Sequence, residues 1–221
     1  MAASFADLVL PRVCVGCGAA TAPLCVRCVA MAEPLRGTVG ELSVSAAAVY
    51  DGAVRTALLA YKERGRRDLA RALAMLLAQA VATQPNDRTV LVPVPSTPAA
   101  RRARGGDHMA RLARAASRTC GLRVSTPLRY GRAVRDSAGL SSAARLDNLN
   151  AAMSAGPPSG RPAVIVDDIA TTGATLREAA RALTAAGWMV AGAAVVAATT
   201  RHDGGGLPWR LASHGSSVRA T

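Results

Sequence analysis

Two adjacent carboxylates, Asp167 and Asp168, follow an apolar run at 163–166 and precede a threonine- and glycine-containing loop. In open α/β sheets, ligands bind beyond the carboxyl ends of the strands. Small residues at Gly173 and Ala174 let the backbone approach a ligand, and free N–H groups at the following helix start can hold a phosphate. Two like charges beside an anion site are costly unless ribose hydroxyls or a hydrated Mg²⁺ offset them. We therefore predict a phosphate and sugar site; the alternative is an ordinary strand, turn and helix with a solvated acidic pair.

Four of the five cysteines form two Cys-x-x-Cys pairs and lie close together in the sequence; they are Cys14, Cys17, Cys25 and Cys28. Two such pairs suit tetrahedral Zn²⁺, so we expect a closed, structural zinc site that could dock a partner. A redox or disulfide pair is the alternative. Only Cys120 follows them, so the pattern is not the even cysteine framework of a small secreted protein.

The chain is basic, with Lys+Arg 27 against Asp+Glu 14 and a formal net charge of +13 over 221 residues. This balance favours anionic partners, either phosphorylated small molecules or nucleic acid, although an arginine-rich composition also follows from a GC-rich genome. Arg101, Arg102 and Arg104 lie in a predicted loop after an apolar run at 90–95. Bidentate contacts from these arginines would bind pyrophosphate, and a solvated basic loop is the alternative for Arg101 and Arg102.

These residues must be positioned by an α/β fold, because strand and helix patterns alternate from residue 90 onward. Helical spacing predicts helices within 53–83, with a break at Gly65, and at 108–120 and 175–186. Apolar runs predict strands at 44–50, 90–95, 122–128, 163–166 and 188–198. A parallel sheet covered on both faces is expected, with the polar stretch 131–150 as a long loop.

No secretory signal is predicted, because the N-terminus lacks a basic region and carries Asp7. The longest uncharged run, 182–200, indicates a helix end, a turn and a strand rather than a membrane span. We expect a cytoplasmic protein without membrane insertion. Its expected parts are a zinc-binding head (1–36), the α/β domain (43–200) and a flexible C-terminal tail (201–221).

The segment 163–175 resembles the 5-phosphoribosyl-1-pyrophosphate (PRPP) motif of type I phosphoribosyltransferases. The resemblance implies that Asp167 and Asp168 bind the ribose hydroxyls. It assigns the 5′-phosphate to the loop residues Ala170, Thr171, Thr172, Gly173, Ala174 and Thr175. Relatives that use hypoxanthine or guanine carry an acidic general base where this chain has Thr171, which makes a 6-oxopurine acceptor less expected.

The order of features over residues 8–200 resembles the ComF family, whose members are phosphoribosyltransferase-like and are associated with DNA uptake in bacterial competence. Five features carry this resemblance: the cysteine head, residues 50–55 with Lys62, the Val-Pro-Val-Pro run at 92–95, a basic Arg-Gly loop and the PRPP motif. The family loop ends in Arg-Gly-Phe-Asn-Gln, whereas residues 104–108 here are Arg-Gly-Gly-Asp-His. The resemblance implies pentosyl transfer, in which a nitrogenous base displaces pyrophosphate from C1 of PRPP with Mg²⁺.

Two non-enzymatic alternatives stay open at this point. The altered 104–108 loop favours a PRPP- or nucleotide-sensing module that acts through a competence-protein partner. The net charge of +13 and the family association favour single-stranded DNA as a ligand. The scarcity of aromatic residues, at 3% of the chain, argues against DNA because stacking platforms would be few. The sequence selects neither an acceptor base nor an oligomeric state.

Overall fold

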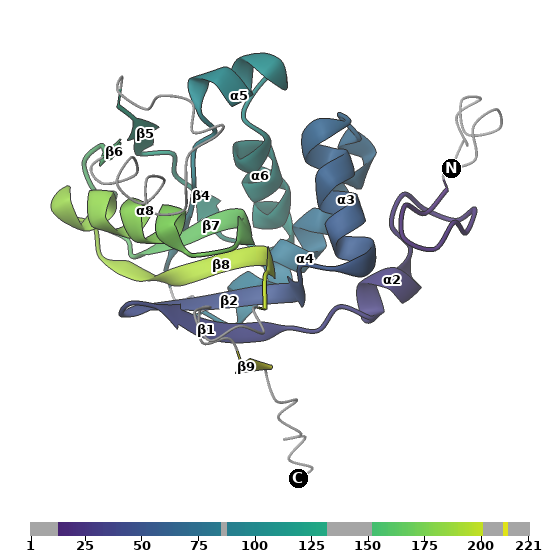
Figure 1. Ribbon diagram of the computed structural model, residues 1–221. Coiled ribbons are helices and arrows are strands. Elements are labelled where there is room, and N and C mark those ends of the chain that lie inside the picture. The colour runs from purple at the N-terminus through teal and green to yellow at the C-terminus, as the bar shows by residue number, and fades with distance from the viewer. Residues whose placement is uncertain (1–12, 85–87, 132–151, 201–209, 212–221) are drawn as a thin grey trace, which may run out of the picture.

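The computed structural model describes residues 13–84, 88–131, 152–200 and 210–211. A seven-stranded sheet in the order β4-β3-β7-β8-β2-β1-β9 forms its centre (Figure 1). The strands are β1 (Leu35–Val39), β2 (Leu42–Val49), β3 (Val90–Pro93), β4 (Arg123–Val124), β7 (Ala163–Ala170), β8 (Val190–Ala198) and β9 (Arg210–Leu211). The strands from β4 to β2 pair in parallel, and β1 pairs antiparallel with both β2 and β9. The predicted α/β fold with a mostly parallel sheet is confirmed.

Helices cover both faces of the sheet (Figure 1). They are α2 (Val26–Ala30), α3 (Gly52–Glu63), a 3-10 turn η1 (Arg67–Leu69), α4 (Ala70–Ala82), α5 (Pro98–Ala103), α6 (His108–Cys120) and α8 (Ala174–Ala185). The side chains of β7 alternate between the two faces, as a pleated strand requires. Val164 and Val166 pack in the core under α3, α4 and α6, whereas Ala163 and Ile165 pack in the core under α8.

Several predicted boundaries agree with the structure for identifiable reasons. The helix predicted at 108–120 is α6, which begins after Asp107 and ends at Gly121 in the left-handed conformation (φ 72°). The break predicted at Gly65 separates α3 from η1, and this glycine has φ 64°. Among the described residues, no helix is long and apolar enough to cross a membrane.

The strand predicted at 122–128 is wrong, because the structure divides it between two sheets. β4 pairs with β3, whereas β5 (Leu128–Tyr130) pairs with β6 (Met153–Ala155) in a separate antiparallel ribbon. Pro127 lies between them and has no N–H to donate, so the β3 ladder cannot continue through it. The predicted loop at 131–150 lies outside the described residues from 132 onward.

The β5–β6 ribbon is attached to α8 by a buried carboxylate. Glu178 is 5% exposed, and its Oε1 accepts a hydrogen bond from the backbone N–H of Met153 at 2.8 Å. Arg181 binds Glu178 and also donates to the Met153 carbonyl at 2.9 Å. This arrangement holds the ribbon beside the carboxyl end of the sheet.

Three further differences concern the site. The strand predicted at 163–166 continues to Ala170 as β7, so both aspartates lie within it. The loop predicted to carry Arg101, Arg102 and Arg104 is wrong in part, because residues up to Ala103 belong to α5. Pro98 begins that helix, and Thr97 Oγ1 accepts from the Ala100 N–H at 3.3 Å. Strand β1 was not predicted. Residues 201–209 and 212–221 of the expected tail lie outside the described residues.

Candidate functional site

Asp168 lies at the centre of the candidate site, on β7, and is 4% exposed. Its Oδ2 atom is 2.9 Å from Nζ of Lys62 on α3 and 2.9 Å from Nε2 of His108 on α6. Three elements that are far apart in the sequence therefore meet at one carboxylate oxygen. Asp167 is only partly buried, and its Oδ1 accepts a hydrogen bond from the N–H of Asp168 at 2.9 Å.

The two aspartates experience opposite electrostatic environments. Burial opposes ionisation of Asp168, but the hydrogen bond from His108 and the Lys62 ammonium prevail and lower its pKa to about 2. Burial and the adjacent Asp168 charge raise the pKa of Asp167 well above its usual range. Asp168 is thus a permanent anion with its own counter-charges, whereas Asp167 gains from a ligand that donates hydroxyl hydrogens to it.

His108 is a site residue that the sequence analysis missed. It lies on the first turn of α6, and its Nδ1 is 2.9 Å from Oγ of Ser96. The Tyr61 hydroxyl donates to the His108 carbonyl at 3.2 Å, and the two rings meet edge to face. The feature that identifies His108 is the strand order. Because β3 and β7 are parallel neighbours, residues that follow β3 lie near the carboxyl end of β7.

The predicted phosphate loop leads from the end of β7 into α8. Ala170 and Gly173 are buried, whereas Thr171 and Thr172 are exposed. Gly173 has φ 71°, and a Cβ atom at this position would lie 2.6 Å from Val39 on β1. Glycine is therefore required both by the backbone conformation and by the close approach of β1.

The start of α8 leaves backbone donors available to a ligand. Within the described residues no side chain caps this helix, although the Ala174 N–H lies 3.4 Å from Thr172 Oγ1. Thr175 follows in the first turn and is partly buried. The loop thus combines exposed hydroxyls with a helix N-terminus, where the backbone dipoles favour a negative charge.

The structure separates the three predicted arginines. Arg101 lines a cavity of about 460 Å³ beside β3 and β5, and Arg114 and Arg129 line the same cavity. Arg101 and Arg102 border a second hollow with Pro98 and Gly106. In the part of the chain that the structure describes, none of these arginines lies within 4 Å of a carboxylate oxygen.

Arg104 lies beside the two residues that contact Asp168. It lines a cavity of about 160 Å³ together with Lys62 and His108. Burial lowers the pKa of Lys62, but the Asp168 carboxylate prevails and raises it. The Arg104 charge acts in the same direction as burial and lowers the pKa of the lysine. The structure therefore joins Arg104, but not Arg102, to the surroundings of Asp168.

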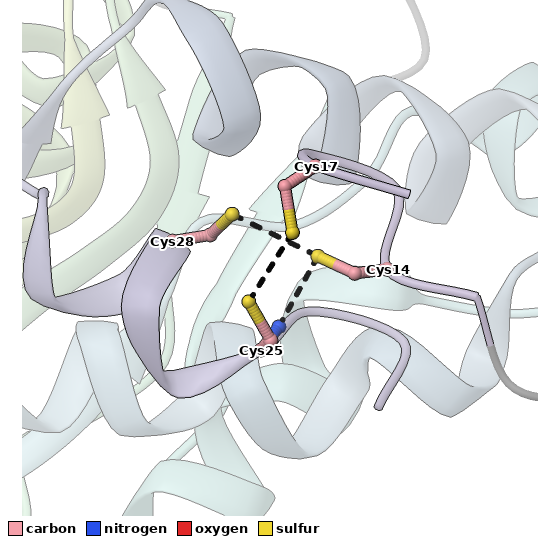
Figure 2. Close-up of side chains that lie close together, drawn as sticks. All are labelled: Cys14, Cys17, Cys25 and Cys28. Atoms are coloured by element: carbon pink, nitrogen blue, oxygen red, sulfur yellow. Dashed lines mark hydrogen bonds between the residues drawn. The ribbon is translucent and has the colours of Figure 1, made fainter. Parts of the chain in front are cut away.

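The four cysteines come together as predicted (Figure 2). Their Sγ atoms all lie within 4.8 Å of one another, with Cys14 3.8 Å from Cys28 and Cys17 3.6 Å from Cys25. A bridge between Val13 and Ala20 closes the turn that carries the first pair, and α2 carries Cys28. Because all four are free thiols, no disulfide occupies the cluster.

The cluster fits a tetrahedral zinc ion. Zn–S bonds of about 2.3 Å place neighbouring sulfur atoms roughly 3.8 Å apart, close to the two distances found here. Burial opposes ionisation of Cys14, but hydrogen bonds from backbone N–H groups lower its pKa to about 6. Burial and the neighbouring cysteines raise the pKa of Cys28 to about 12. The four sulfur atoms would hold zinc as thiolates, and the ion would supply the positive charge that their joint ionisation requires.

The cluster is packed directly on the α/β domain. A Cβ atom on Gly16 would lie 2.5 Å from Cβ of Ala53 on α3 and 2.9 Å from Sγ of Cys28. Cys14, Cys25 and Cys28 belong to the same buried core as α3 and α4. A cavity of about 270 Å³, lined by Cys28, Met31 and the start of α3, borders the junction.

Comparison with known proteins gives a family model. A model described as "Phosphoribosyl transferase domain" matches residues 65–210. The match begins after α3, so Lys62 and the four cysteines lie outside it. No curated protein matches the sequence significantly.

Three solved structures are similar at low identity. Orotate phosphoribosyltransferase from Aeropyrum pernix is 16% identical, with 65% of this chain and 64% of that chain covered and a TM-score of 0.35. Glutamine PRPP amidotransferase from B. subtilis, complexed with ADP and GMP, is 16% identical over 74% and 43%, with a TM-score of 0.39. An allosteric regulatory enzyme of purine biosynthesis is 21% identical over 58% and 25%, with a TM-score of 0.36. The chain thus spans between 25% and 64% of the length of these structures.

Proposed function

The chain belongs to the phosphoribosyl transferase domain family, and we propose from this membership that it binds PRPP with Mg²⁺. We further propose, from the order of features over residues 8–200, that it is a protein of the ComF type. The observation that carries the proposal is the pair Asp167 and Asp168 at the end of β7, followed by the loop into α8. Carboxylates accept hydroxyl hydrogens, and the helix start favours a phosphate. A ribose 5-phosphate carries both groups at a spacing that suits adjacent sites.

Each part of PRPP has a counterpart in this proposal. The ribose hydroxyls donate to Asp167 and Asp168, and residues 170–175 hold the 5′-phosphate. The pyrophosphate lies against the arginine-lined cavity, where Arg101 is joined by Arg114 and Arg129. When bound to the pyrophosphate, Mg²⁺ would supply positive charge to the leaving group, beside the arginines that line this cavity. Arg104 adds positive charge on the side of Lys62.

The proposed reaction is pentosyl transfer. A nitrogen of the acceptor base forms a bond to C1 of PRPP as the bond from C1 to the pyrophosphate oxygen breaks, and the bond electrons leave with pyrophosphate. Positive charge develops on the ribose at C1, and the arginines stabilise the negative charge on the leaving group. The base loses its N–H proton to water, because Thr171 supplies no general base.

The cysteine head (1–36) is proposed to hold one structural zinc ion and to dock a partner beside the phosphoribosyltransferase-like domain (43–200). The packing of Gly16 against Ala53 supports a head that is fixed on the domain. Four zinc-bound thiolates suit the reducing cytoplasm, where we place the protein.

A second candidate is a PRPP- or nucleotide-sensing module without transfer chemistry, acting in DNA uptake through a competence partner or single-stranded DNA. The observation that favours it is the occupied Asp168 carboxylate, which already holds Lys62 and His108 at 2.9 Å. Such a site binds ribose without requiring turnover.

Pyrophosphate release distinguishes the two candidates. The full chain is incubated with PRPP, Mg²⁺ and each of a panel of purine and pyrimidine bases, and released pyrophosphate is measured. Release that depends on one base, and that is lost in Asp167→Asn/Asp168→Asn, supports the transferase. PRPP binding without base-dependent release supports the sensor. Absence of PRPP binding contradicts the transferase and the PRPP-sensing form of the second candidate.

A further inference from the structure

His108 is held by packing and hydrogen bonds where α3, α6 and β7 meet. Its ring is edge to face with Tyr61, with centroids 6.4 Å apart, and the residue is 9% exposed. Both ring nitrogens have partners, since Nε2 meets Asp168 and Nδ1 meets Ser96, each at 2.9 Å. A ring held this firmly fixes the position of the carboxylate it touches.

The hydrogen bonds continue from Ser96 to Asp107. Ser96 Oγ is 3.2 Å from Asp107 Oδ1, and the Ser96 N–H donates to Asp107 Oδ2 at 3.1 Å. Asp107 in turn accepts from the N–H groups of Met109 and Ala110 and so caps α6. Asp168 on β7 is thus connected through His108 to the loop between β3 and α6.

The hydrogens available to Asp168, His108 and Ser96 limit which of these groups can donate a hydrogen bond. Ionised Asp168 only accepts, so Nε2 of His108 must carry a hydrogen. Ser96 has one hydroxyl hydrogen for two acceptors, Nδ1 of His108 and Oδ1 of Asp107. The Ser96 hydroxyl lies within hydrogen-bond distance of both, so Ser96 connects the His108 ring to Asp107.

Other charges surround the ring. Lys62 and Glu63 lie on α3, Arg67 lies on η1, and Arg104 and Arg111 complete the small cavity that His108 lines. Lys62 also contacts Asp168 Oδ2, but its side chain is 23% exposed and has a flexible stem. Its ammonium acts as a point charge and does not fix the orientation of the carboxylate. The imidazole is the rigid member of the pair.

We propose that His108 is a positioning residue that holds Asp168 for the ribose by linking it through Ser96 and Asp107 to the loop after β3. Both contacts to Asp168 fall on Oδ2, so Oδ1 is the oxygen that neither Lys62 nor His108 engages. Oδ1 would receive a ribose hydroxyl, and the link would couple the ribose end of the site to the arginine-bearing loop. This inference rests on the proposed function.

Calorimetric titration with PRPP and Mg²⁺ tests the link in the full chain. We expect His108→Ala to weaken PRPP binding about tenfold or more. His108→Gln should stay within about threefold of the native chain, because an amide N–H can donate to Asp168 in place of the ring N–H. Ser96→Ala should weaken binding, whereas the control Ser117→Ala should not, because the Ser117 hydroxyl donates to the Leu122 carbonyl near the opposite end of α6 from His108. Native affinity in His108→Ala, or failure of His108→Gln to rescue, would overturn the proposal.

A measurement without PRPP keeps this inference distinct from the proposed function. In ¹⁵N-labelled protein, the His108 ring, assigned by its loss in His108→Gln, should show a slowly exchanging Nε2–H that disappears in Asp168→Ala, which removes the acceptor. If the native chain shows this signal but binds no PRPP, the proposed function fails and the link stands. If Nε2 carries no hydrogen, the link is wrong whatever the protein binds.

Discussion

The cysteine cluster and the Asp168 site each gather several polar side chains, but they balance charge differently. The cysteines come from a single turn and a short helix, and their joint ionisation would need a cation such as the proposed zinc ion. Asp168 is balanced by Lys62 and His108, which reach it from α3 and α6. The proposed zinc site would depend on an ion for its stability, whereas the Asp168 site depends on the packing of the domain around it.

Removal of one zinc ligand should give the largest effect. Cys17→Ser changes the exposed member of the cluster, so little packing is lost with the sulfur atom. We expect bound zinc to fall from one per chain to near zero and the head to lose stability on the order of 10 kcal/mol, the scale of structural zinc sites. Elemental analysis and thermal melts measure both quantities.

The control for this prediction is Cys120→Ser, which removes a thiol at the end of α6, away from the cluster. It should leave the zinc content unchanged. A native chain purified without zinc, with a melting temperature that a chelator does not lower, would contradict the account of this region.

The two aspartates should respond to neutralisation in opposite directions. Asp168→Asn leaves Lys62 and His108 facing an uncharged group, and loss of a buried partner costs about 3 kcal/mol. Asp167→Asn removes a carboxylate whose ionisation the fold disfavours, and should raise the stability of the ligand-free chain. Thermal melts at neutral pH should differ in sign, and a loss of stability in both variants would contradict this assignment.

The pH dependence of stability follows from the same pair. The Asp168 pKa is lowered from 3.8 to about 2, so its contribution is present above pH 3.8 and is lost as the pH falls toward 2. The Asp167 pKa is raised, so its unfavourable contribution is present above that raised value and fades as the pH falls through it. Melts of Asp168→Asn should therefore lack the loss of stability between pH 4 and 2 that Asp168 contributes.

A smaller effect is expected from Gly173→Ala, which strains the phosphate loop against β1. The control is Gly160→Ala, because Gly160 has φ 75° but no atom within 4 Å of an added Cβ. The left-handed conformation costs each variant about 1 kcal/mol, and the Val39 contact adds roughly 1–2 kcal/mol to Gly173→Ala alone. Chemical denaturation measures the difference, and Val39→Ala should reduce it. Equal losses in the two glycine variants would mean that Val39 does not constrain the loop.

The smallest effect is expected from the exposed arginines. Arg129→Gln should weaken PRPP binding a few-fold, because one exposed charge contributes up to about 1 kcal/mol. The difference should shrink at high salt. Arg118→Gln, an exposed arginine on α6 that does not line the cavity, is the control. Equal titration curves for the two variants would contradict a contact between Arg129 and the pyrophosphate of PRPP.

The two regions also differ in how far the sequence predicts them. The cysteine cluster is local, so the spacing of its residues was sufficient. The loop from Asp167 to Thr175 was likewise recognisable, because strand, acids and helix start are consecutive. His108 was missed because its role depends on β3 lying beside β7, and the sequence pattern does not set strand order. Strand β7 was predicted too short because buried carboxylates are unexpected in a strand without their distant counter-charges.

Calorimetric titration with PRPP and Mg²⁺ tests the central claim most directly. The native chain is compared with Asp167→Asn/Asp168→Asn, at a temperature where both are folded. Asp68→Asn, which removes a surface carboxylate paired with Arg66, is the control for charge. We predict saturable binding by the native chain and the control, a thermal stabilisation of about 2.7 kcal/mol at a hundredfold excess over Kd, and no binding by the double variant. Equal binding by the double variant, or no binding by the native chain, would contradict the proposed PRPP site.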